Sequence, residues 1–134
     1  MSTWSDIPGG YPGSTLWVDG WNLSNIGNPA AHLNAVPSAG TFLVTAAGAT
    51  YRVAGGAPLP ITNCTVLGGC TSPVTIDSWD IAHLSGSQTG LGPVPLVGTV
   101  VEGLPSGAYW EYESGGWVTT GSTASAVQVD DGSV

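Results

Sequence analysis

Paired carboxylates are the first residues in this sequence whose type and spacing would suit catalysis. Asp77 and Asp80 stand three positions apart, and Glu111 and Glu113 stand two apart. A glycoside hydrolase uses two such acids, one on each side of the scissile bond. The two glutamates fall in an extended stretch, which places both on one strand face about 7 Å apart, where solvated acids are common. Neither pair belongs to a recognisable catalytic motif, so we predict that the chain is not an enzyme.

Metal binding would require more ligands than this sequence brings together. Cys64 and Cys70 enclose a loop of five residues, and His32 and His83 are the only imidazoles. Neither histidine has zinc-finger spacing relative to the cysteines, and the acidic residues lack the spacing of a calcium loop. The cysteines are therefore expected to have a structural role, either as a disulfide staple or as two buried thiols. We expect no metal and no cofactor.

Four aromatic residues gather in one predicted hairpin around residues 108–119: Tyr109, Trp110, Tyr112 and Trp117. Because side chains of a strand alternate between its two faces, about half of them are expected in the core. We assign Trp110 and Trp117 to the core. Tyr109 and Tyr112 are assigned to the surface, as a flat platform for a glycan or for a contact between subunits.

Residues 1–14 differ from the rest of the chain, because proline and glycine interrupt them repeatedly. Trp4, Ile7 and Tyr11 are large apolar side chains in a segment too irregular to bury them by itself. Ordering such a segment costs on the order of 1 kcal/mol per residue, so burial against a partner has to compensate. We predict an extended N-terminal arm that docks on another protein chain through these three residues.

The composition favours a folded domain built from short strands. Hydrophobic residues make up 42% of the 134 positions and charged residues only 7%, whereas disordered chains combine low hydrophobicity with high charge. The 21 glycines and 10 prolines lie between short runs of valine, threonine and aromatic residues. This pattern is typical of many strands joined by tight turns.

The charge balance argues against two classes of partner. One basic residue, Arg52, stands against nine acidic residues, which gives a net charge of -8. Nucleic-acid backbones are bound by clusters of lysine and arginine, so we expect no nucleic-acid partner. We also expect no membrane insertion, because no apolar run approaches the roughly 18 residues that span a bilayer. The first residues lack the basic and apolar regions of a signal peptide, so either a leader has been removed or the protein is made as an intact frame in the cytoplasm. The natural-looking ends and the absence of a tag favour the intact frame.

An internal repeat defines the elements that must position these residues. Val18-Asp19-Gly20-Trp21-Asn22-Leu23 aligns with Ile76-Asp77-Ser78-Trp79-Asp80-Ile81, and further matches follow at nearly the same offset. Val129-Asp130 resembles the opening of a third copy. An ordered series of matches is not expected by chance, even in a glycine-rich chain. It predicts two repeat units, residues 15–72 and 73–134, in one compact domain.

Each unit is expected to begin with a short helical turn and to continue as a three-stranded meander. Asp19 and Asp77 are predicted N-caps, because a carboxylate accepts hydrogen bonds from the free N–H groups at a helix start. Trp21 and Trp79 are predicted to anchor the cores. The expected strands are residues 41–45, 50–53 and 58–61, then 99–101, 108–112 and 117–119. A single meander is marginally stable, so the predicted fold class is all-β, with both units packed into a sandwich or barrel-like body.

Two stretches of the first unit carry a resemblance to a known family. Gly40-Thr41-Phe42-Leu43 and Tyr51-Arg52-Val53-Ala54-Gly55-Gly56-Ala57-Pro58 resemble a tandem β-repeat of secreted and surface-associated actinobacterial proteins. The resemblance covers about residues 17–84 and fades in the second unit. Such repeats imply display on a cell envelope, or attachment to one, and they imply no catalytic residues.

The length, the missing leader and the composition also resemble a virion protein of an actinobacteriophage. The first hypothesis is therefore a non-enzymatic structural protein of the virion surface, a capsid decoration or tail-surface protein. It would dock on the capsid or tail lattice and form a homo-oligomer. The alternative is a secreted cell-wall or glycan-binding module that uses Tyr109 and Tyr112 as its platform.

Overall fold

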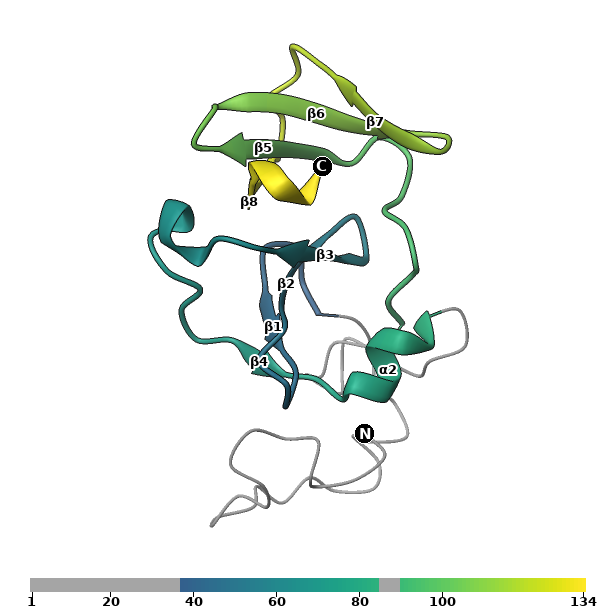
Figure 1. Cartoon of the computed structure of the whole chain (residues 1–134). Helices are drawn as coiled ribbons and strands as arrows, with labels where there is room; N and C mark the ends of the chain where they lie inside the picture. Colours follow the sequence, from purple (N-terminus) through teal and green to yellow (C-terminus); the bar gives the residue numbers. More distant parts are fainter. Residues whose placement is uncertain (1–36, 85–89) are drawn as a thin grey trace, which may run out of the picture.

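A computed structural model describes residues 37–84 and 90–134 of the chain. Within these ranges, eight strands form two sheets of four, accompanied by one short helix and two 3-10 turns (Figure 1). The predicted all-β fold class is confirmed. The proposed docking arm and the first copy of the helical turn lie outside the described residues, and with them Trp4, Ile7, Tyr11, Asp19 and Trp21.

The first sheet is a meander completed by a parallel strand. Strands β1 (Phe42–Val44), β2 (Thr50–Ala54) and β3 (Ala57–Ile61) pair antiparallel in sequence order. Strand β4 (Val74–Thr75) then pairs parallel with β1, which gives the order β3-β2-β1-β4. The β2–β3 turn consists of Gly55 and Gly56, both with positive φ, which is the conformation that a tight two-residue hairpin turn requires.

The second sheet repeats this arrangement, and three of its four strands are longer than their counterparts. Strands β5 (Val100–Leu104), β6 (Ala108–Glu113) and β7 (Gly116–Thr119) form the meander, and β8 (Val127–Asp130) pairs parallel with β5. The order is β7-β6-β5-β8. A 3-10 turn, η5 (Asp131–Ser133), follows β8 and contacts β3 and β5, so it lies between the two sheets (Figure 1).

The register shows that the two sheets are equivalent residue by residue. In the first sheet, Leu43 of β1 lies opposite Tyr51 of β2 and Val74 of β4. In the second sheet, Val101 of β5 lies opposite Trp110 of β6 and Val127 of β8, and is therefore the equivalent of Leu43. The fourth strand of the first sheet comes from residues that the repeat analysis assigned to the second unit. The fourth strand of the second sheet is the opening of the third copy. Each sheet is therefore completed by the sequence motif that begins the next copy.

Two hydrophobic cores flank the first sheet. The core between the sheets contains five buried residues: Ala54, Leu59, Ile61, Val101 and Val129. The core on the other side lies beneath helix α2 (Ser78–Ala82) and contains four: Leu43, Val53, Ile76 and Leu91. Among the described residues, the first sheet is thus buried on both faces and the second sheet on one.

Candidate functional site

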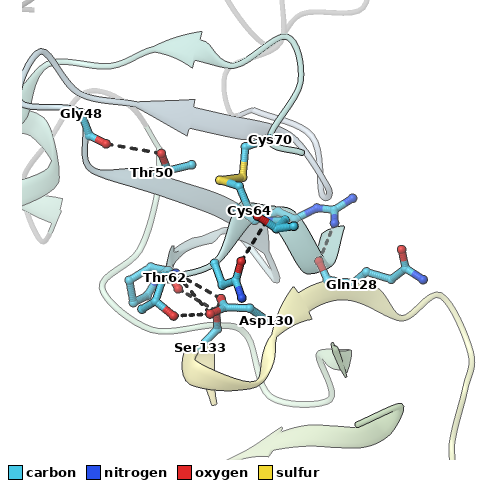
Figure 2. Close-up of a disulfide and its surroundings, with 12 residues drawn as sticks. Gly48, Thr50, Thr62, Cys64, Cys70, Gln128, Asp130 and Ser133 are labelled. Carbon is cyan, nitrogen blue, oxygen red and sulfur yellow. Dashed lines mark hydrogen bonds between the residues drawn. A yellow bond between two sulfur atoms is a disulfide. The ribbon is translucent and has the colours of Figure 1, made fainter. Parts of the chain in front are cut away.

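The two cysteines form a disulfide next to the core between the sheets. Cys64 and Cys70 are bridged, with their Cα atoms 5.1 Å apart (Figure 2). Cys64 begins the 3-10 turn η3 (Cys64–Leu67), which Asn63 caps by accepting a hydrogen bond from the Thr65 N–H at 3.0 Å. Both cysteines and Leu67 pack against the core. Of the two alternatives that the sequence left open, the structure has the disulfide.

A buried carboxylate joins the second sheet to the first. Asp130 is 3% exposed and accepts hydrogen bonds from the backbone N–H and hydroxyl of Thr62, just after β3, and from the hydroxyl of Ser133 (Figure 2). Burial by itself raises the pKa of Asp130, but the hydrogen bonds from Ser133 and Thr62 outweigh it and hold the pKa below its ordinary value. The ionised form of Asp130 is therefore the one that fits this site.

The equivalent aspartate in the first sheet has a different task. Asp77 is 1% exposed and is the N-cap of α2, where its carboxylate accepts a hydrogen bond from the Trp79 N–H at 2.8 Å. This is the capping role predicted from the sequence. Asp80, the other member of the carboxylate pair, is also buried. Because one carboxylate caps a helix and both are buried, the pair does not form an exposed acid–base site.

Trp79 is not a core residue, so the prediction that it anchors its unit is wrong. Its side chain is 50% exposed, and its ring stacks on that of His83, with the centroids 4.3 Å apart. Ile81 and Leu84 pack against the core beneath α2 instead. Ile81 lies in α2 and Leu84 follows the C-cap His83, whereas Trp79, two positions before Ile81, lies on another face of the helix.

The structure separates the two tyrosines that were predicted to form a joint platform. Trp110 and Trp117 pack against the core between the sheets, as predicted. Tyr112 lies on the same face of β6 as Trp110 and contacts Trp117 edge-on, with 5.2 Å between ring centroids. Tyr109 is an odd number of positions away and therefore points to the opposite face. The platform prediction is wrong for this pair, because alternation along the strand cannot place both rings on one surface.

The face of the second sheet that points away from the first sheet is acidic. Glu102 lies opposite Tyr109 in the register, and Glu111 and Glu113 occupy the same face of β6. Partial burial and then the negative charge of Glu102, together with a hydrogen bond to it, raise the pKa of Tyr109. Gln128 donates a hydrogen bond to Glu102 at 3.0 Å. In the described part of the chain, no group of three or more His, Cys, Asp or Glu side chains is placed to hold a metal ion.

Arg52 holds the two sheets together. Its guanidinium donates to the backbone oxygen of Gln128 in β8 at 2.6 Å and to that of Gly40 at 3.2 Å. It also lies over the ring of Phe42, 4.5 Å from the centroid. Burial lowers the pKa of Arg52. The sequence does not predict this role, because it depends on the packing of the two sheets that brings β8 close to Arg52.

An exposed apolar strip lies in the connection between helix α2 and strand β5. Val94, Leu96 and Val97 are 55%, 72% and 71% exposed, and we call these three residues the linker strip. The strip borders a cleft of about 450 Å³ whose lining carries no charged side chain: Pro37, Gly55, Gly56, Gly90, Gly92, Val94 and Leu96. The sequence analysis missed the strip, although the uninterrupted apolar run 94–97 is its signal.

Backbone hydrogen bonds fix the linker strip to the first sheet. The Leu96 N–H donates to the Gly55 oxygen at 2.9 Å, and the Gly92 N–H donates to the Gly56 oxygen at 2.8 Å. A Cβ atom on Gly55 would overlap the side chain of Thr99, so only glycine permits this approach. The strip is therefore an ordered surface with defined backbone contacts.

No helix in the described ranges is long and apolar enough to cross a membrane. Comparison of the chain with protein-family models, with curated proteins and with solved structures finds no match. The function has to be argued from the surfaces of the molecule itself.

Proposed function

We propose that this protein is a non-enzymatic structural protein of a virion surface, which docks on the protein lattice of a capsid or tail. The observation that carries the proposal is the linker strip. Contiguous exposed apolar surface on a small folded domain marks a contact site, and three of the six exposed large hydrophobic side chains of the described residues lie in this strip. Its uncharged character fits the apolar surface of another protein.

The way the strip is held also supports docking. Its backbone is fixed by the hydrogen bonds to Gly55 and Gly56, so little conformational freedom is lost when a partner covers it. The residues 1–14 with Trp4, Ile7 and Tyr11 remain a predicted second anchor, and copies bound side by side on a lattice would form the predicted homo-oligomer. The resemblance of residues 17–84 to surface-displayed repeats is consistent with a place on the outside of a particle.

A secreted cell-wall or glycan-binding module remains the second candidate, and one observation favours it. The half-exposed ring of Trp79 stacks on His83 and presents a flat aromatic surface. The Cys64–Cys70 disulfide suits an oxidising compartment outside the cytoplasm. In this candidate Trp79 replaces the tyrosine pair as the residue that contacts the sugar.

Co-sedimentation distinguishes the two candidates. Purified protein is mixed with actinobacteriophage particles stripped of surface proteins and, separately, with actinobacterial cell walls. We expect binding to particles, a loss of at least about tenfold in affinity for Leu96→Asp because a charge must then be buried, and no loss for Trp79→Ala. Val118→Asp is the matched control, since Val118 is an exposed valine (39%) outside the strip.

One outcome would overturn the assigned docking site, and another would overturn the virion proposal. Particle binding that survives Leu96→Asp unchanged would remove the linker strip from the docking site. Binding to cell walls that Trp79→Ala abolishes, without particle binding by any variant, would establish the glycan-binding candidate in its place.

A further inference from the structure

One face of the first sheet is the surface on which the second sheet packs, and we call it the stacking face. It is formed by alternate residues of β1, β2 and β3, and apart from Arg52 at its centre these residues are apolar or neutral: Phe42, Val44, Thr50, Ala54, Leu59 and Ile61. Ala54, Leu59 and Ile61 are buried there against Val101 and Val129 of the second sheet. Arg52, on the same face, is satisfied by its bonds to the backbone of β8 and of Gly40.

The second sheet presents its own stacking face to the outside. Because the registers of the two sheets agree, each residue of the first stacking face has an identified counterpart. Glu102 takes the place of Val44, Glu111 that of Arg52, and Glu113 that of Ala54. The remaining counterparts carry no charge. Phe42 corresponds to Val100, Thr50 to Tyr109, Leu59 to Val118 and Ile61 to Thr120.

The negative charge of the glutamate side chains is concentrated on this outer face. The chain has three glutamates, and all three lie there. An ionised carboxylate that is buried without a cationic partner is strongly unfavourable. The chain's single basic residue is Arg52, whose guanidinium already binds between the sheets. A second copy of this protein therefore has no lysine and no further arginine with which to neutralise the three carboxylates.

We propose that Glu102, Glu111 and Glu113 close the stacking face of the second sheet, so that no further sheet, and in particular no second copy of the chain, packs on it. Stacked repeats need a terminal unit with a polar outer face, because an apolar one would recruit another unit. The second sheet is that terminal unit. Val100, Tyr109 and Val118 still offer an apolar background, so the three carboxylates alone keep the face free.

Neutralising the three positions tests the proposal. The variant E102V/E111Q/E113A takes the first sheet's residues at two positions and a neutral one at the third. We expect it to associate with itself at least about tenfold more tightly than the unchanged protein, because the charges no longer oppose burial. E102D/E111D/E113D, which alters the same sites and keeps the charges, should retain the assembly state of the unchanged protein. Sedimentation velocity over a range of concentrations measures both.

A cross-link identifies the face that associates. The substitution Val118→Cys places a thiol on the outer face, and in the neutralised variant it should form disulfide-linked dimers that are absent when Val118→Cys is placed in the unchanged protein. If the triple variant does not fold, E111Q/E113A, confined to β6, provides the measurement with a smaller expected gain. A folded neutral variant with unchanged assembly state, or association without a cross-link at position 118, would overturn the proposal. Lattice binding through the linker strip does not enter either readout.

Discussion

The two sheets share one strand order and one register, yet they stand in different surroundings. The first sheet has a core on each face, one beneath α2 and one against the second sheet. Within the described part of the chain, the second sheet has a core on its inner face only, and its outer face carries Glu102, Glu111 and Glu113. Backbone pairing is therefore the same in both copies, and the side chains at a few register positions decide whether a face becomes interior or surface.

The equivalent aspartates Asp77 and Asp130 also differ in their interactions, although they hold the same position in the repeat. Asp77 follows β4 and caps α2, whereas Asp130 ends β8 and binds Thr62 of the first unit. The repeated motif fixes the position of a buried carboxylate after the parallel strand. The segment that packs next to this position determines which backbone N–H groups donate hydrogen bonds to the carboxylate. A repeat can thus keep its residues while their interactions change.

Substitution of equivalent residues on the two stacking faces should give the largest difference. Leu59→Ala removes a side chain that is 6% exposed, and we expect the free energy of unfolding to fall by about 2–5 kcal/mol. Val118→Ala, at the equivalent place in the second sheet, removes a side chain that is 39% exposed and should cost less than about 1 kcal/mol. Urea denaturation of both variants measures the difference. Equal losses would mean that the outer face is covered in solution.

The disulfide distinguishes the connections that lead into the two parallel strands. Cys64 and Cys70 close the connection before β4, and the connection before β8 contains no cysteine. We expect Cys64→Ser combined with Cys70→Ser to lower the free energy of unfolding by about 2 kcal/mol, because the short loop limits the entropy that the cross-link removes. Urea denaturation with and without a reductant measures it. Reduction should lower the stability of the unchanged protein and leave that of the double variant as it was.

The aspartate that joins the sheets should make stability depend on pH. The pKa of Asp130 is lowered in the folded protein, so its contribution is fully present above the ordinary carboxyl pKa of 3.8 and is lost as the pH falls through the folded value. Asp130→Asn should cost on the order of 1 kcal/mol at neutral pH, since hydrogen bonds to an ionised acceptor are lost. The variant should also show a flatter decline in stability below about pH 4.

Asp131→Asn is the matched control for this pH dependence. It removes a charge at the next position and weakens the hydrogen bonds that Ser106 of the second sheet donates to Asp131, but it leaves the hydrogen bonds between Asp130 and Thr62 in place. Its acid profile should therefore keep the slope that Asp130→Asn loses. If the two variants have the same profile, net charge and not the bond between the sheets governs acid stability.

The limits of prediction from the sequence are clearest at Trp79 and Tyr112. Strand positions, turn glycines and the capping Asp77 follow from local rules of alternation, backbone conformation and hydrogen bonding, and the structure has them. The repeat motif led to the prediction that Trp79 anchors the core, but a motif does not reveal which face of the helix packs against the core. Tyr109 and Tyr112 are three positions apart on β6, so alternation along the strand by itself puts the two rings on opposite faces. The contacts between sheets, such as Arg52 on β8, depend on packing that no local rule provides.

The smallest expected effect concerns the electrostatics of the outer face. Partial burial and the negative charge of Glu102 raise the pKa of Tyr109 above its ordinary value of 10.0. Glu102→Gln removes the charge and leaves the ring in place, so the pKa of Tyr109 should fall toward that value without reaching it. Ultraviolet absorbance follows tyrosine ionisation at alkaline pH, and subtracting the curve of Tyr109→Phe isolates this residue.

The position of the charge, and not its mere presence, should decide the size of this effect. Glu113 lies on the same face of β6 as Tyr109 but four residues further along the strand, a separation of about 13 Å. This distance exceeds the Debye length of about 8 Å at physiological ionic strength, so Glu113→Gln should move the pKa of Tyr109 much less than Glu102→Gln does. Equal shifts from the two substitutions would show that Tyr109 senses only the net charge of the chain. In that case the close pairing of Glu102 with Tyr109 across β5 and β6 would not be the source of the raised pKa.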